Sequence, residues 1–236
     1  NNKGRNETLK ITKNSNLNED NYKFFMREML ILQKLNHPNI ISLYNYDVID
    51  YNIYWSLNDY CNLGPLSNLL NLKSFFTESL RYKFFEQIMG AISYIHKNNI
   101  IHRDIKPGNI FMNGIHIEDS NINFKIGDFN LSRLLIDNSR YEKNSPLSIC
   151  GTQQYMAPEL IMGKLYDNKV DVWSFLCVYV KFCGSKVQRI RANGILNRQV
   201  ELAIKNEICL SKKQIKLYNF LPTNLINELT EFTKLE

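Results

Sequence analysis

The sequence predicts an α+β protein with a small β-rich lobe followed by a larger, mainly helical lobe. Short strand-like segments come first along the chain and long helical segments follow, an order that favours the α+β class. The chain has 236 residues, of which 44% are hydrophobic. That is enough for one sizeable core, or for two small lobes that share one cleft.

The first lobe is expected to hold three strands and one helix. Residues 7–13 are typical of a short strand. A helix is expected over about 19–35, because apolar residues recur there at spacings of four and three: Phe25, Met29, Leu32 and Leu35. The sequence His37-Pro38-Asn39 would end it. Two further strands and a turn-like connector then follow, at 40–48, 53–57 and 61–65.

The second lobe is expected to be built around two apolar helices. The first begins after Thr77, a suitable N-cap, and carries a buried stripe with a spacing of four: Leu80, Phe84, Ile88 and Ile92. Short strands and loops follow from 100 to about 134, then a polar segment over 136–148. The second helix is expected at about 170–183, and later helices at 190–208 and 225–235.

Composition narrows the function classes. No stretch approaches the roughly 20 apolar residues that cross a bilayer, so we expect no membrane span. The five cysteines form no CxxC pair, which argues against a disulfide framework or a zinc site and favours a cytoplasmic or otherwise intracellular location. The net charge of +6 is scattered along the chain, so we expect no nucleic-acid partner.

Four segments carry the candidate chemistry, and each would be weak evidence alone. They are His102-Arg103-Asp104-Ile105-Lys106-Pro107-Gly108-Asn109, Asp128-Phe129-Asn130, Gly151–Glu159 (GTQQYMAPE) and Asp171-Val172-Trp173-Ser174. Their types, order and spacing over residues 3–183 resemble the eukaryotic protein kinases, of the serine/threonine type and weakly of the tyrosine-kinase-like group. The resemblance implies one bilobal kinase domain over 1–236, with lobes at 1–58 and 64–236 joined by a hinge at 59–63.

The resemblance also implies roles for the charged residues. Asp104 would accept the proton of a substrate hydroxyl, and Lys106 would neutralise the migrating phosphoryl group. Asn109 and Asp128 would hold Mg²⁺ through oxygen atoms, the ligands that this cation prefers. Lys10 would hold the ATP phosphates, paired with Glu28 eighteen residues later.

Further residues would form the adenine pocket and the core beside it. Asn58 falls at the gate behind the adenine, and the hinge residues Asp59, Tyr60 and Cys61 would offer backbone groups to the base. Phe111 would form the floor of the pocket. A stacked apolar column that links the lobes in this family would consist of Leu32, Leu43, His102 and Phe129.

The resemblance extends to a regulatory site. Ser148 lies three residues before Gly151, at the offset where the family often carries an activating phosphate, and Arg103 would bind that phosphate. Ser145 and Tyr141 are lesser candidates. An upstream kinase or autophosphorylation would supply the phosphate.

Three departures from the family pattern leave alternatives open. No Gly-rich phosphate loop is present, and Lys3-Gly4-Arg5-Asn6 resembles the strand that follows such a loop, so we expect the loop upstream. Asn130 replaces a glycine, and asparagine is the next-best residue for positive φ. Leu176 replaces another glycine, and no arginine partner for Glu159 follows Leu235.

The main hypothesis is therefore a serine/threonine protein kinase that uses ATP and Mg²⁺ on a protein substrate. The alternatives are a pseudokinase that acts as a binding or scaffolding module, and a small-molecule kinase on a related fold.

Overall fold

The computed structural model describes residues 6–13, 19–50, 53–70, 77–115, 122–134, 150–161, 163 and 165–182. The chain divides into two compact units, Asn1–Phe182 and Cys183–Glu236. All described residues belong to the first unit. The predicted polar segment at 136–148, with Tyr141, Ser145 and Ser148, and the helices predicted at 190–208 and 225–235 lie outside the described residues.

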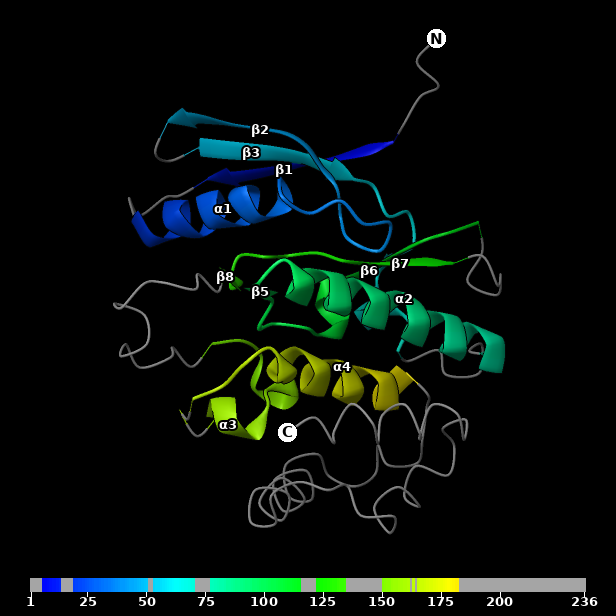
Figure 1. Ribbon diagram of the computed structural model, residues 1–236. Helices are drawn as coiled ribbons and strands as arrows, with labels where there is room; N and C mark the ends of the chain where they lie inside the picture. The colour runs from blue at the N-terminus through cyan, green and yellow to red at the C-terminus, as the bar shows by residue number, and fades with distance from the viewer. Residues whose placement is uncertain are drawn as a thin grey trace. The chain divides into compact units, whose positions relative to one another are not determined.

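The N-terminal part is a three-stranded antiparallel sheet with one helix packed on it (Figure 1). Strands β1 (Glu7–Lys13), β2 (Leu43–Asp50) and β3 (Ile53–Asp59) lie in the order β1-β3-β2. Helix α1 spans Glu19–Leu32. Phe25 of α1 packs on Tyr54 of β3 with ring centroids 4.4 Å apart, and both side chains are buried. The α+β prediction, its first strand and its helix are confirmed.

Strand β2 begins later than the sequence predicts, at Leu43 rather than Ile40. The backbone just before it pairs with a different sheet. Ile40 forms a parallel bridge with Ile126, the N–H of Ile41 donates to Ile126 O at 2.8 Å, and the N–H of Ile126 donates to Asn39 O at 2.9 Å. Because these groups are satisfied by a distant strand, residues 39–41 cannot extend the β2–β3 ladder.

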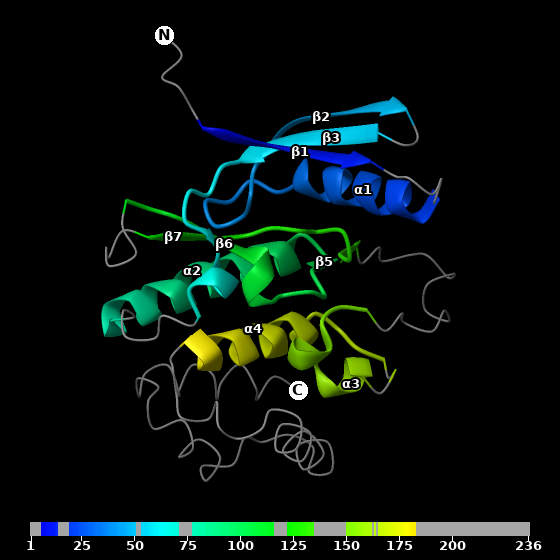
Figure 2. The same ribbon diagram turned by 180° about the vertical axis from the view of Figure 1, so that it is seen from behind.

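The rest of the first unit is organised by two helices, α2 (Glu78–Lys97) and α4 (Lys169–Phe182), which contact each other (Figure 2). Thr77 caps α2, and its side chain accepts a hydrogen bond from the N–H of Leu80 at 3.2 Å. The predicted stripe on α2 is fully buried. Phe84 lies at its centre, with ring centroids 4.7 Å from Phe124 and 4.3 Å from Phe182.

Short strands lie before α2 and between α2 and α4. Strands β4 (Gly64–Pro65), β6 (Ile110–Asn113) and β7 (Asn123–Ile126) form one sheet, and β5 (Ile100–Ile101) pairs with β8 (Arg133–Leu134). Helix α3 spans Pro158–Ile161. No helix among the described residues is both long and apolar enough to cross a membrane.

Candidate active site

The loop after β5 is anchored by a buried carboxylate of α4. Asp171, 1% exposed, accepts the backbone N–H groups of His102 and Arg103, each at 2.8 Å, and contacts His96 Nε2 at 2.9 Å. The anchor holds Arg103 in a left-handed conformation with φ of 66°. A non-glycine residue adopts this conformation only when its surroundings impose it, so Asp171 fixes the backbone that leads into Asp104.

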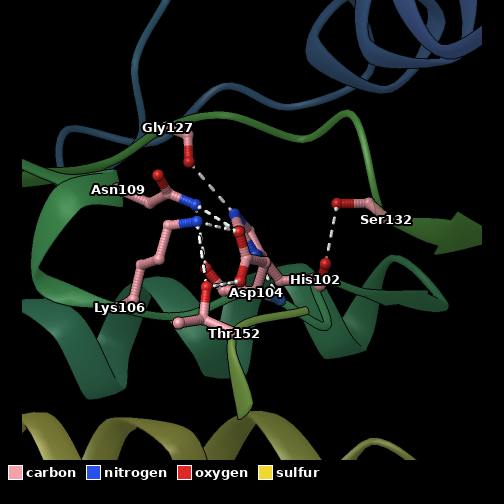
Figure 3. A network of polar contacts seen from close by, with 7 residues as sticks. All are labelled: His102, Asp104, Lys106, Asn109, Gly127, Ser132 and Thr152. Atoms are coloured by element: carbon pink, nitrogen blue, oxygen red, sulfur yellow. Dashed lines mark hydrogen bonds and ion pairs between the residues drawn. The ribbon is translucent and has the colours of Figure 1, made fainter. Parts of the chain in front are cut away.

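Asp104 lies at the centre of a polar network (Figure 3). Its Oδ2 atom accepts from Lys106 Nζ at 2.6 Å and from Asn109 Nδ2 at 3.0 Å. Its Oδ1 atom accepts from Thr152 Oγ1 at 2.9 Å. The side chain of Asp104 is 4% exposed, and that of Lys106 is 30% exposed. The carboxylate is thus held in one orientation, with a cation beside it on the more open side.

Thr152 joins this network from a segment 48 residues away in sequence. Lys106 Nζ donates to Thr152 Oγ1 at 3.1 Å, so the hydroxyl proton of Thr152 is directed to Asp104. The close approach depends on Gly151, whose φ is +108° and whose added Cβ would lie 2.5 Å from the Arg103 carbonyl oxygen. Only glycine fits there, which explains the Gly-Thr pair. Thr152 belongs to the Gly151–Glu159 segment, and its sequence pattern does not indicate this contact with Asp104.

His102 has a defined tautomer because of its two partners. Its Nε2 atom lies 3.1 Å from the carbonyl oxygen of Gly127, which can only accept, so Nε2 carries the proton. Its Nδ1 atom then accepts from the N–H of Asp104 at 3.3 Å. The ring packs edge-on against Phe129 at 4.7 Å, and Phe129 is fully buried. His102, Phe129 and Leu32 are all core residues, as the predicted apolar column requires, whereas Leu43 is half-buried.

Asp128 has the features expected of a metal ligand. Its backbone is left-handed, with φ of 64°, and its Oδ1 atom is buried without a hydrogen-bond partner among the described residues. A buried carboxylate oxygen left unpaired is costly unless a ligand completes it. Asn109 uses its amide nitrogen for Asp104, so its oxygen is the atom available to a metal. One carboxylate and one amide oxygen fit Mg²⁺, which takes its other ligands from water and phosphate.

Asn130 does not use the positive φ that asparagine tolerates. The non-glycine residues with positive φ in the described part of the chain are Asn99, Arg103 and Asp128. The left-handed residue of this turn is thus Asp128, two residues before Asn130. The replacement of glycine by asparagine causes no backbone strain here. Its side-chain oxygen is buried and has no partner within the described residues.

Lys10 and Glu28 meet across the sheet and helix of the N-terminal part. Lys10 Nζ lies 3.4 Å from Glu28 Oε2; the lysine side chain is 51% exposed and the glutamate 7%. The other oxygen, Oε1, accepts from the backbone N–H of Phe129 at 3.2 Å. Glu28 therefore connects the lysine to the segment that carries Asp128.

The expected hinge residues follow directly from β3. Asp59 is the last strand residue, its N–H donates to Ser42 O at 3.1 Å, and only its carbonyl could serve a nucleobase. Tyr60 is exposed and Cys61 is half-buried. Burial raises the pKa of the Cys61 thiol to about 11.

Phe111 lies on β6 and is half-buried. Its ring packs close to Gly127, the residue before Asp128. A Cβ added to Gly127 would lie 3.0 Å from the Phe111 ring and 2.9 Å from Ile41. The chain therefore needs glycine at position 127 to bring β7 against the expected floor of the pocket. Asn58, the expected gate, donates from Nδ2 to Ser56 Oγ at 2.8 Å.

Arg103 already has partners in this structure. Its Nε atom donates to Leu131 O at 2.8 Å, and Nη1 donates to Tyr166 OH at 3.0 Å. Ser148, its predicted phosphate-bearing partner, lies outside the described residues, so the regulatory pairing stays a prediction. Burial and the nearby Asp167 raise the pKa of Glu159.

Comparisons with known proteins agree with this geometry. A family model described as "Protein kinase domain" matches residues 1–230. The human serine/threonine-protein kinase ULK1 is 33% identical over 201 residues, which cover 81% of this chain and 19% of that protein. The cell cycle serine/threonine-protein kinase CDC5/MSD2 of Saccharomyces cerevisiae is 39% identical over 166 residues, covering 70% and 22%. The serine/threonine protein kinase OSK3 of Oryza sativa subsp. indica is 37% identical over 161 residues, covering 67% and 29%.

The chain thus spans between 19% and 29% of the length of these curated relatives. The family match extends over nearly all of this chain, well beyond the motifs that first indicated the resemblance. The chain belongs to the protein kinase domain family.

Proposed function

We propose that this chain is the catalytic domain of a serine/threonine protein kinase, which transfers the γ-phosphate of ATP to a serine or threonine hydroxyl of a protein. The observation that carries the proposal is the Asp104 network, in which a buried carboxylate is oriented by Lys106, Asn109 and Thr152. The three relatives are all named serine/threonine-protein kinases, which supports the serine/threonine type. The assignment to the tyrosine-kinase-like group stays a prediction.

Asp104 would orient the substrate hydroxyl and accept its proton. Its carboxylate is fixed on both oxygens, so little reorganisation is needed when the hydroxyl arrives. Lys106, which is partly exposed beside it, would stabilise negative charge on the phosphoryl group in transit. Thr152 holds the Oδ1 atom of Asp104 and the Nζ atom of Lys106 together, which keeps the acid–base group and the cation at a fixed separation.

Magnesium would be held by Asp128 and Asn109, and it would neutralise charge on the ATP phosphates. Lys10 would bind the phosphates from the opposite side. Glu28 supports both ends of this arrangement, because one carboxylate oxygen pairs with Lys10 and the other holds the backbone N–H of Phe129. The hinge from Asp59 to Cys61 and the Phe111 ring would hold the adenine.

The same proposal places the protein in a reducing, intracellular compartment. The free thiols of Cys61, Cys150 and Cys177 support this location. An upstream kinase or autophosphorylation would act on Ser148, and phosphopeptide mapping of the active protein would test that site.

The decisive experiment is a transfer assay on the full-length protein. It uses labelled ATP, magnesium and a generic basic protein substrate, followed by phosphoamino-acid analysis. We expect label on serine or threonine with the wild type, and loss of at least about 100-fold with Asp104→Asn or Asp128→Asn. Asp167→Asn, the same change at an exposed position, is the control and should transfer normally. A folded wild type as silent as the two variants would refute the proposal and favour the scaffolding alternative.

A further inference from the structure

A second buried polar cluster lies away from Asp104, at the junction between the expected hinge and β7. Asp59 Oδ2 accepts from Lys125 Nζ and from the N–H of Ser42, each at 2.9 Å, and its Oδ1 atom accepts from the hydroxyl of Tyr44. The side chains of Asp59 and Lys125 are 15% and 12% exposed. Both carboxylate oxygens are therefore occupied, by donors from two other segments.

Asp59 is held in its ionised form. Burial alone would raise the pKa of Asp59, but the hydrogen bonds from Tyr44, Lys125 and Ser42 outweigh burial and leave that pKa below its usual value. A partly buried ion pair with its acceptors filled contributes geometric specificity more reliably than it contributes stability. The arrangement is thus suited to fix the distance between the elements that it joins.

Those elements are the two ends of the expected nucleotide site. Asp59 opens the hinge that would hold the adenine. Lys125 lies three residues before Asp128, the expected magnesium ligand. Two residues lie between Lys125 and Asp128 in the sequence. Ile126 forms a parallel β-bridge with Ile40, and the N–H of Gly127 donates to Asn109 O at 2.9 Å. A displacement of Lys125 would therefore pass directly along β7 to the metal ligand.

We propose that Asp59, Lys125 and Tyr44 are positioning residues that set the separation between the nucleobase end and the metal end of the site, and thereby nucleotide affinity. The inference rests on the proposed function. One ATP molecule must contact both ends at once, so a preset separation lowers the free-energy cost of binding. The hydrogen bonds described above for Asp59, Lys125 and Tyr44 lie within their own cluster and do not involve Asp104, so the transfer step itself should change little.

The test measures KM for ATP, KM for the protein substrate and kcat in the full-length protein. Lys125→Met removes the charge and keeps the length of the side chain; we expect KM for ATP to rise about tenfold, with kcat and the other KM within about twofold. Lys125→Arg should restore KM for ATP to within about threefold, since it can still donate to Asp59. Tyr44→Phe removes a single hydroxyl and should raise KM for ATP by a smaller factor. It takes the place of Lys125→Met as the test if that variant does not fold. Lys169→Met, at an exposed lysine of α4, is the matched control.

A readout that needs no nucleotide separates this inference from the proposed function. Hydrogen exchange at the Ile126 and Gly127 amides should accelerate in Lys125→Met and return toward the wild-type rate in Lys125→Arg. If the wild type binds no nucleotide, the proposed function fails, and exchange still decides whether Lys125 positions β7. Three results for Lys125→Met would each overturn the positioning role: an unchanged hydrogen-exchange rate at Ile126 and Gly127, an unchanged KM for ATP, or a higher kcat.

Discussion

The substitution Asp171→Asn tests whether a single carboxylate holds the catalytic loop. Asp171 accepts three donors, the N–H groups of His102 and Arg103 and the Nε2 group of His96, and it is 1% exposed. Asparagine has the same shape but presents one oxygen and one NH₂ group. Whichever way the amide is turned, its NH₂ group faces at least one backbone N–H at hydrogen-bonding distance. One hydrogen bond is lost, and one buried donor is left unpaired.

The loss of this hydrogen bond gives the magnitude. Removing one partner so that a buried donor stays unpaired costs about 1–3 kcal/mol, and the upper part of that range applies because the lost bond is to a charged group. The expected destabilisation is therefore about 1.5–3 kcal/mol. For a chain of this size, each kcal/mol lowers Tm by about 2–4 °C, so the fall should be at least about 3 °C. Because Arg103 is held left-handed by the same contacts, Asp104 should also lose its orientation, and transfer should fall with it.

Thermal unfolding of the full-length protein measures the first effect, and the transfer assay measures the second. Asp47→Asn is the matched control. Asp47 is exposed and accepts a hydrogen bond from the N–H of Val48 at 2.8 Å, which an asparagine side chain can accept equally well. A Tm for Asp171→Asn within about 2 °C of the control, with transfer intact, would refute the view that Asp171 carries the loop.

Other predictions follow from single features of the site. Gly151→Ala should abolish transfer, because its Cβ would lie 2.5 Å from the carbonyl oxygen of Arg103; normal turnover would contradict the contact. Cys61, with a pKa of about 11 instead of 9.0, should be alkylated by iodoacetamide at pH 8 about 100-fold more slowly than an ordinary thiol, as followed by mass spectrometry. The pKa of Glu159 is raised above its ordinary value of 4.5 in the folded protein. Its stabilising contribution is therefore complete below pH 4.5 and is lost as the pH rises through the folded-state pKa, because the buried side chain then becomes charged. Glu159→Gln should therefore raise Tm at pH 7, and this gain should vanish below about pH 4.5. Stabilisation by ATP should require magnesium and should be lost in Asp128→Asn; a shift that persists with EDTA would argue against the metal site.

Local patterns in the sequence predicted much of this fold. The buried stripe of α2 and the cap at Thr77 are short-range features, and the structure contains both. The family was also predictable, because phosphoryl transfer demands fixed residue types at fixed spacing, and the family match confirms it. The roles of Asp104, Lys106 and Asn109 stay predictions that the geometry supports.

The sequence could not show contacts between distant segments. Asp59 looked like a hinge residue, yet its side chain pairs with Lys125, 66 residues later, and nothing in either local pattern indicates the other. The start of β2 was placed too early for the same reason, since residues 39–41 read as strand but bond to β7. The motif Asp128-Phe129-Asn130 gives the residue types of a turn and leaves open which residue takes the left-handed conformation, which is Asp128 in the structure.

The hydrogen bond between Asn39, in the loop after α1, and strand β7 also bears on how the chain folds during synthesis. Asn39 Nδ2 donates to Phe124 O at 2.9 Å across 85 residues, and Asn39 is buried. At about 5–20 residues per second, a ribosome needs about 4–17 s to add that stretch. During this interval the loop lacks its partner strand, and its polar groups and the apolar residues around it remain uncovered. The N-terminal sheet is thus an unfinished folding unit until β7 emerges, and this is the period when a nascent-chain chaperone would protect it best.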